Sequence, residues 1–241
     1  MNLRRLRVNS PSPARATGPL NQALSQRALA PWLAIGVVGA ASLAGFNTPG
    51  WLPPAFLEEH GPVEVMTIWL YLVTVPVLLL ADAPGLRWAD RLALVVVMLS
   101  FAAREADLHK ALFGMSMLKA RFYTSFASPA QIAISLAVLL QVAGAAAWLI
   151  ARHGARWRSS VSNWSASDVS VATFVVTMIA AKCFDRLPET LIDIRLVSEL
   201  PGAIRQLMLG VEEILELALP LLAMLAMAQA TGKPRSRVSS R

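Results

Sequence analysis

Ionisable side chains occur inside four apolar segments of this chain. One segment, FAAREADLHKALFGMSMLKARFYTS (101–125), ends the apolar run LALVVVMLSFAA and then presents Arg104, Glu105 and Asp107. Glutamates occur in the same way in GPVE (61–64) and GVEEILE (210–216), and charged residues of both signs occur in AAKCFDR (180–186). Ionisable groups in such segments are costly to bury and commonly mark binding sites or proton relays. The chemistry that they favour is acid–base catalysis by a carboxyl group, or binding of an anionic group by the bases.

The candidate site combines carboxylates and bases from all four segments. The candidate catalytic acid or base is Glu64, Glu213 or Glu216. The candidate binding residues are Arg104, Glu105, Asp107, Lys182, Asp185, Arg186 and Glu212. Because unpaired charges in hydrocarbon are unfavourable, we expect Arg104 and Lys182 to pair with carboxylates on the second or last run. A purely structural charge network fits this pattern as well as a functional site does.

Helical spacing predicts how these residues share faces. Arg104 and Asp107, and likewise Lys182 and Asp185, are three residues apart, and Glu212 and Glu216 are four apart. Residues at either spacing lie on one face of a continuous helix. Each set is therefore expected to point in one direction from its own helix.

Histidine and cysteine give no metal signature. His60 and His109 are weak metal-ligand candidates, and no H-E-x-x-H motif or Cys/His cluster accompanies them. His153 lies in a basic connection, where no role is expected for it. The single cysteine, Cys183, excludes an intramolecular disulfide. No metal or other cofactor is predicted.

The elements that must position these residues are transmembrane helices. The chain has 241 residues, of which 56% are hydrophobic and 15% charged, proportions typical of a polytopic membrane protein. Six apolar runs, each near the ~20 residues that cross a bilayer, cover 29–46, 63–81, 90–108, 129–151, 168–186 and 204–228. The predicted fold class is all-α, a six-transmembrane-helix bundle. Residues 1–27 form a basic tail predicted to be disordered, 28–229 the transmembrane domain, and 230–241 a second basic tail.

Basic residues predict the orientation of this bundle. Fourteen of the 22 Lys and Arg residues, with 3 acidic residues, fall on the side of the two tails, against 8 basic and 12 acidic residues on the other side. Cytoplasmic segments are enriched in Lys and Arg, so both termini are predicted to be cytoplasmic. The expected location is a bacterial-type inner membrane. The net charge of +7 is accounted for by these tails and connections, and no nucleic-acid partner is expected.

Three of the runs have uncharged stretches too short to cross a membrane alone. These stretches, 92–103, 169–181 and 217–228, hold 12 or 13 residues. At ~1.5 Å per residue they cover ~18–20 Å of a hydrocarbon core ~30 Å thick. Charged residues must complete each span, and in each case they lie at the non-cytoplasmic end. The sequence therefore predicts an inward-facing ionic cluster near that face.

Three classes of function fit such a cluster. Its mixed charge at the level of lipid head groups favours a lipid-handling membrane-embedded enzyme or lipid-binding protein, whose partners are membrane lipids and whose ligand is an anionic head group or small molecule. Whether it is catalytic stays open. A proton- or ion-coupled transporter would use Glu64 and Glu213 as carriers and would need a path through the apolar cytoplasmic halves. A non-catalytic assembly protein would show a closed, fully paired cluster and make contacts through 47–60, 109–128 and 187–203.

Overall fold

The computed structural model describes residues 25–47, 61–158 and 161–231, and this part of the chain is helical without strands. The α-helices are α2 (Leu29–Asn47), α3 (Pro62–Leu80), α4 (Trp88–Glu105), α5 (Leu108–Phe113), α6 (Pro129–Trp157), α7 (Ala166–Asp193) and α8 (Gly202–Thr231). A π-helical turn, Phe122–Phe126, precedes α6, and a short 3₁₀ turn, Val161–Asn163, precedes α7. The all-helical class is thus confirmed. Both predicted tails lie largely outside the described residues.

Each predicted apolar run contains a helix, but not every helix is apolar enough to span a membrane. Four helices of the described part, α3, α6, α7 and α8, have the length and hydropathy to cross a bilayer. Helices α2 and α4 are not among these four candidates, and α4 carries charges at both ends. The fold is therefore that of a helical membrane protein with four candidate spans, and the count of six stays a prediction.

The helix starts follow local sequence signals. Gly61 and Pro62 begin α3, where proline needs no hydrogen-bond donor. Ser165 and Asp168 form a reciprocal capping box at α7, in which Asp168 N–H donates to Ser165 Oγ at 3.3 Å and Ser165 N–H to Asp168 Oδ2 at 2.9 Å. These caps satisfy backbone N–H groups that have no partner within the first turn.

The C-terminal end of α4 determines which residues can share a face. Helix α4 ends at Glu105, and Asp107 adopts a left-handed backbone with φ 46° before α5 begins. The expectation that Arg104 and Asp107 share a helix face is therefore wrong, because spacing rules hold only within a continuous helix. Asp107 instead pairs with Lys110 of α5, with 2.6 Å between Oδ2 and Nζ.

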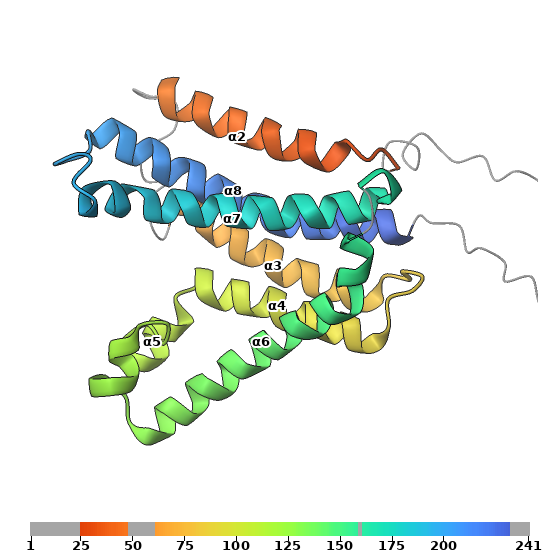
Figure 1. Cartoon of the computed structure of the whole chain (residues 1–241), viewed down its shortest axis with the longest axis horizontal. Coiled ribbons are helices and arrows are strands. Elements are labelled where there is room, and N and C mark those ends of the chain that lie inside the picture. The colour runs from red at the N-terminus through yellow and green to blue at the C-terminus, as the bar shows by residue number, and fades with distance from the viewer. Residues whose placement is uncertain (1–24, 48–60, 159–160, 232–241) are drawn as a thin grey trace, which may run out of the picture.

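Helices α7 and α8 pack side by side at the centre of the molecule (Figure 1). Helices α2 and α3 both pack against α8, α4 packs against α3, and α6 packs against α4. An apolar core fills the space between α3, α4 and α8, and its fully or nearly fully buried members include Leu78, Met98, Leu219 and Met227. This core extends toward the end of the molecule where α2 begins and α8 ends.

Helix α6 is inclined to the other helices and leaves most of its surface uncovered (Figure 1). Few residues of its apolar stretch are buried, and Ile134, Leu140 and Ile150 are well exposed. In a membrane protein such a surface is suited to contact with lipid. The helix continues to Trp157, so Arg152 and His153 lie on a helix and not in the connection that the sequence suggested.

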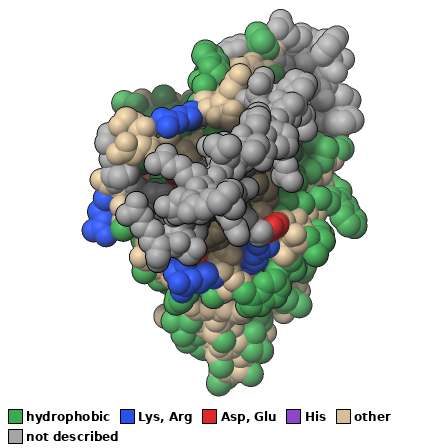
Figure 2. Space-filling view, turned by 90° about the vertical axis from the view of Figure 1, so that its right-hand side faces the viewer, with side chains coloured by type: hydrophobic (Ala, Val, Ile, Leu, Met, Phe, Trp, Pro, Cys, Tyr) green, Lys and Arg blue, Asp and Glu red, His purple; other side chains and the backbone are tan. Residues whose placement is uncertain are grey.

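The first and last described segments lie at the same end of the molecule, together with the α3–α4 connection (Figure 1). Figure 2 views this end and shows Lys and Arg side chains gathered there, with hydrophobic side chains along the flanks. Arg27 at this end donates from Nη1 to the Ser162 carbonyl at 2.8 Å, which links the start of α2 to the connection before α7.

Candidate functional site

Glu216 of α8 lies at the centre of the ionic cluster. Its side chain is 4% exposed, and two bases from different helices reach the same carboxylate oxygen. Arg104 Nη1 of α4 lies 3.1 Å from Glu216 Oε1, and Lys182 Nζ of α7 lies 2.7 Å from it. Charge-assisted hydrogen bonds of this length are among the strong ones in proteins. The expected pairing of both bases with a carboxylate of the last helix is observed.

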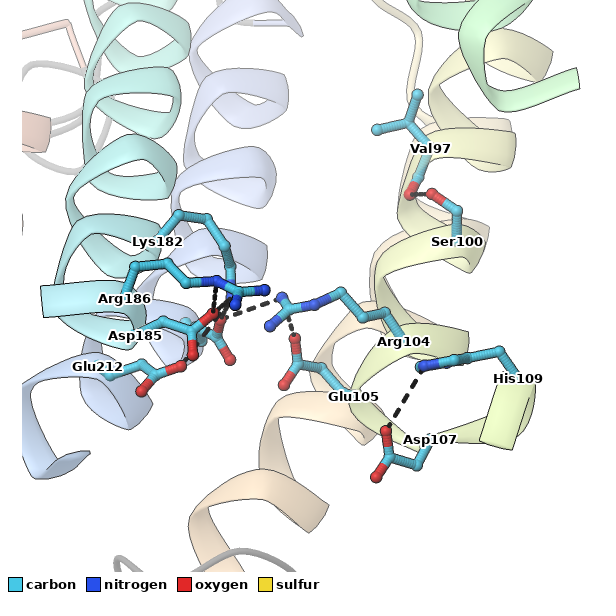
Figure 3. A network of polar contacts seen from close by, with 11 residues as sticks. Val97, Ser100, Arg104, Glu105, Asp107, His109, Lys182, Asp185, Arg186 and Glu212 are labelled. Atoms are coloured by element: carbon cyan, nitrogen blue, oxygen red, sulfur yellow. Dashed lines mark hydrogen bonds and ion pairs between the residues drawn. The ribbon is translucent and has the colours of Figure 1, made fainter. Parts of the chain in front are cut away.

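Glu105 adds a second buried carboxylate to this contact. Its Oε1 lies 3.1 Å from Arg104 Nη1, the nitrogen that also contacts Glu216. Figure 3 shows Arg104 and Glu105 reaching from α4 toward the side chains of α7 and α8. Two carboxylates that share one guanidinium nitrogen repel each other in a low-dielectric site, and such a pair can hold one proton between them. The arrangement is therefore chemically capable of proton transfer.

Lys182 connects the centre of the cluster to its periphery. Besides Glu216, its Nζ lies 3.4 Å from Asp185 Oδ2 and 3.9 Å from Glu212 Oε1. Arg186 lies farther out, 3.8 Å from Asp185 Oδ2, and is largely exposed. Together α4, α7 and α8 supply six connected side chains, and we use the term ionic cluster for Arg104, Glu105, Lys182, Asp185, Glu212 and Glu216.

Two carboxylates of the ionic cluster are buried, whereas Asp185 and both bases are partly exposed. The side chains of Glu105 and Glu216 are nearly inaccessible, whereas those of Arg104 and Lys182 are 35% and 38% exposed. Both bases therefore keep part of their surface available for a ligand while they pair with Glu216.

Aromatic rings from three helices lie next to the ionic cluster. Phe101 of α4 stacks on Tyr71 of α3 with ring centroids 5.7 Å apart, and contacts Phe174 of α7 at 6.1 Å. Phe101 precedes Glu105 by four residues, so its ring lies one turn from the charged groups. Together with the apolar core, these rings lie between the ionic cluster and the end of the bundle where α2 begins and α8 ends.

The other predicted residues lie at several places in the fold, and one lies outside the described part. Glu213 is buried in α8 and Glu64 lies half-buried in the first turn of α3. Asp107 belongs to the separate pair with Lys110, and His109 Nε2 lies 4.0 Å from Asp107 Oδ1. Burial lowers the pKa of His109 below its usual value, so this imidazole is neutral at pH 7. His60 lies outside the described residues.

No metal site is formed by the described residues, since no group of three or more His, Cys, Asp or Glu side chains has a suitable arrangement there. The roles assigned to the candidate residues from the sequence stay predictions, whereas their positions and ion pairs are as given above.

Sequence reasoning missed a second buried carboxylate, at the opposite end of α4. Asp90 is fully buried and accepts hydrogen bonds from Trp148 Nε1 at 3.0 Å and from Arg152 Nε at 2.9 Å. The Arg87 N–H also donates to it at 3.0 Å, and His153 Nε2 lies 3.7 Å away. This contact is too long for a hydrogen bond, and the expectation that His153 has no role stays a prediction. Asp90 joins α6 to α4.

Comparisons with protein-family models, curated proteins and solved structures gave no match. The fold and the ion pairs define the chain as a helical membrane protein with buried charged residues.

Proposed function

We propose that the protein is a lipid-handling membrane protein whose ionic cluster binds the anionic head group of a lipid. The observation that carries this proposal is the pairing of nearly inaccessible Glu216 with two bases that remain about one-third exposed. Glu216 fixes Arg104 and Lys182 from the buried side, and their exposed surfaces are suited to phosphate oxygens.

The buried carboxylates give this site a possible catalytic function. Glu105 and Glu216 lie on one guanidinium nitrogen, so a proton held by the pair is placed beside the group that the bases bind. A bound lipid at this position would meet a general acid or base without further rearrangement. Glu64 and Glu213 are the other acid–base candidates, and the variants Glu64→Gln and Glu213→Gln test them.

Two features favour this function over the alternatives. The aromatic contacts of Phe101 and the apolar core beyond them place apolar side chains between the ionic cluster and the opposite end of the bundle, which disfavours transport of a proton or ion. The partial exposure of Arg104 and Lys182 disfavours a purely structural network within an assembly protein.

The decisive experiment compares lipid binding by wild type and Lys182→Gln in detergent. Glu216 keeps Arg104 as a partner in this variant, so the bundle should fold. We expect binding of phosphatidylglycerol to weaken about tenfold, the equivalent of ~1.4 kcal/mol, because one charge-assisted contact is lost. Binding is read by native mass spectrometry, with phosphatidylcholine as the reference lipid.

Lys119→Gln is the matched control, because Lys119 is an exposed lysine outside the ionic cluster. It should bind phosphatidylglycerol as the wild type does. If Lys182→Gln and Lys119→Gln have equal effects, the ionic cluster does not bind the head group and the proposal fails.

The proposed orientation places both termini and the α3–α4 connection in the cytoplasm, with six crossings. It rests on the distribution of Lys and Arg and on the end of the molecule that these segments share. In a Cys183→Ala background, a cysteine at position 120 should react with an impermeant maleimide in intact cells. A cysteine at 155 should react only after permeabilisation, and reaction at 155 in intact cells would reverse the orientation.

A further inference from the structure

Tyr71 is a buried polar residue that the ion pairs do not use. It lies on the buried face of α3 with Thr67, Thr74 and Leu78, and its side chain is fully inaccessible. The two threonines satisfy their hydroxyls within their own helix, since Thr67 Oγ1 donates to the Val63 carbonyl at 2.9 Å and Thr74 Oγ1 to the Leu70 carbonyl at 2.7 Å. The Tyr71 hydroxyl, at the end of a long ring, has no hydrogen-bond partner among the described residues.

Tyr71 lies beside the part of the ionic cluster that α4 supplies. Its ring stacks on Phe101, 5.7 Å away between centroids with an interplanar angle of 29°, and this contact fixes the ring beside the last turn of α4. Glu105, Glu216 and Arg104 are the charged groups that act on this hydroxyl. A buried hydroxyl without a partner is unfavourable, and phenylalanine would pack in the same place without that penalty. The tyrosine is therefore suited to a partner that enters from the ionic cluster.

The geometry points to a ligand hydroxyl group between Tyr71 and the carboxylates of Glu105 and Glu216. A hydroxyl is both a donor and an acceptor, so it accepts from the Tyr71 O–H and donates to a carboxylate oxygen. A phosphate oxygen is only an acceptor and would be repelled by two carboxylates at this depth. We infer that the site prefers lipids whose head group carries a free hydroxyl, with Tyr71 as the residue that recognises it.

This inference rests on the proposed function, because it assigns to the bound lipid a hydroxyl beside the phosphate that Arg104 and Lys182 hold. The two can be separated with four probes. Phosphatidylglycerol offers phosphate and hydroxyl, phosphatidic acid offers phosphate without a head-group alcohol, diacylglycerol offers a hydroxyl without phosphate, and phosphatidylcholine offers neither a hydroxyl nor a net negative charge.

The test is Tyr71→Phe, with Tyr123→Phe as the matched control. Tyr123 also has a buried hydroxyl without a partner among the described residues, but it lies in the π-helical turn before α6. We expect Tyr71→Phe to weaken phosphatidylglycerol and diacylglycerol binding about tenfold and to leave phosphatidic acid binding unchanged. Tyr123→Phe should change none of them. Thermal unfolding of Tyr71→Phe without added lipid should be unchanged or shifted upward, because the variant removes an unpaired hydroxyl.

Equal binding of phosphatidylglycerol and diacylglycerol by Tyr71→Phe and wild type would overturn the hydroxyl assignment, and an effect of Lys182→Gln would then still support the proposed function. Conversely, Tyr71→Phe could lose diacylglycerol binding while Lys182→Gln has no effect. That result would support the hydroxyl assignment and contradict the proposed binding of the head-group phosphate. If Tyr71→Phe weakens all four probes equally, Tyr71 has a structural role and the inference fails.

Discussion

Replacing Glu216 by glutamine should destabilise the protein by about 3 kcal/mol, at the lower end of the range for removing one partner of a buried charge pair. The variant keeps the shape of the side chain but leaves Arg104 and Lys182 without the carboxylate that they share at 3.1 and 2.7 Å. The loss should stay near the lower end because Arg104 keeps Glu105, and Lys182 keeps Asp185 as a partner. The measurement is the free energy of unfolding in detergent or the shift in Tm.

Glu189→Gln is the control for Glu216→Gln. Glu189 pairs with Arg186 at 3.7 Å, and both side chains are mostly exposed, so the change should stay within ~0.5 kcal/mol. A double-mutant cycle of Glu216→Gln with Lys182→Gln should show a coupling of about 1–3 kcal/mol. Additive effects of the two substitutions, or a Glu216→Gln protein as stable as wild type, would contradict the central position assigned to Glu216.

Asp90→Asn should have an effect of similar size at the other end of α4. Asp90 is an acceptor for Trp148, Arg152 and the Arg87 N–H, whereas the amide of asparagine turns an N–H₂ group toward at least one of these donors. We expect a loss of about 3 kcal/mol, because a charged donor loses its partner in a buried position. Since Asp90 joins α6 to α4, trypsin should also cleave faster after Arg152.

Asp82→Asn provides the comparison for Asp90→Asn, because Asp82 is an exposed aspartate in the connection that precedes α4. It should change the stability and the cleavage after Arg152 little. Equal effects of the two substitutions, or an Asp90→Asn protein that resists trypsin as wild type does, would show that Asp90 does not hold α6 in place.

The sequence predicts the helices closely because the length of an apolar run is limited by the membrane. The run 63–81 corresponds to α3 (Pro62–Leu80), and 204–228 lies within α8. The sequence also predicts that Arg104 and Lys182 pair with carboxylates of the second or last run, and the structure shows both on Glu216 of the last helix. By contrast, the count of six crossings depends on α2 and α4, which are not among the four candidate spans.

Contacts between helices could not be predicted from spacing along one helix. Asp90 meets Trp148 and Arg152 across 58 and 62 residues, and nothing in the pattern of either segment indicates that they face each other. Tyr71 looks like an ordinary aromatic residue of an apolar run until its hydroxyl is found to lack a partner among the described residues. Asp107 was misplaced because sequence spacing does not reveal that α4 ends two residues earlier.

Arg104 and Glu216 lie far apart along the chain, so the two partners of this ion pair are synthesised at different times. These residues are 112 positions apart, so α4 leaves the ribosome long before its counter-ion on α8 is made. Helix α6 is apolar enough to enter lipid unaided, whereas the bases of α4 and α7 acquire the carboxylate that they share, Glu216, only with the last helix. A polypeptide truncated before α8 would leave both bases without Glu216 and would remain a substrate for membrane quality-control proteases. The ionic cluster is therefore complete only after α8 has been synthesised.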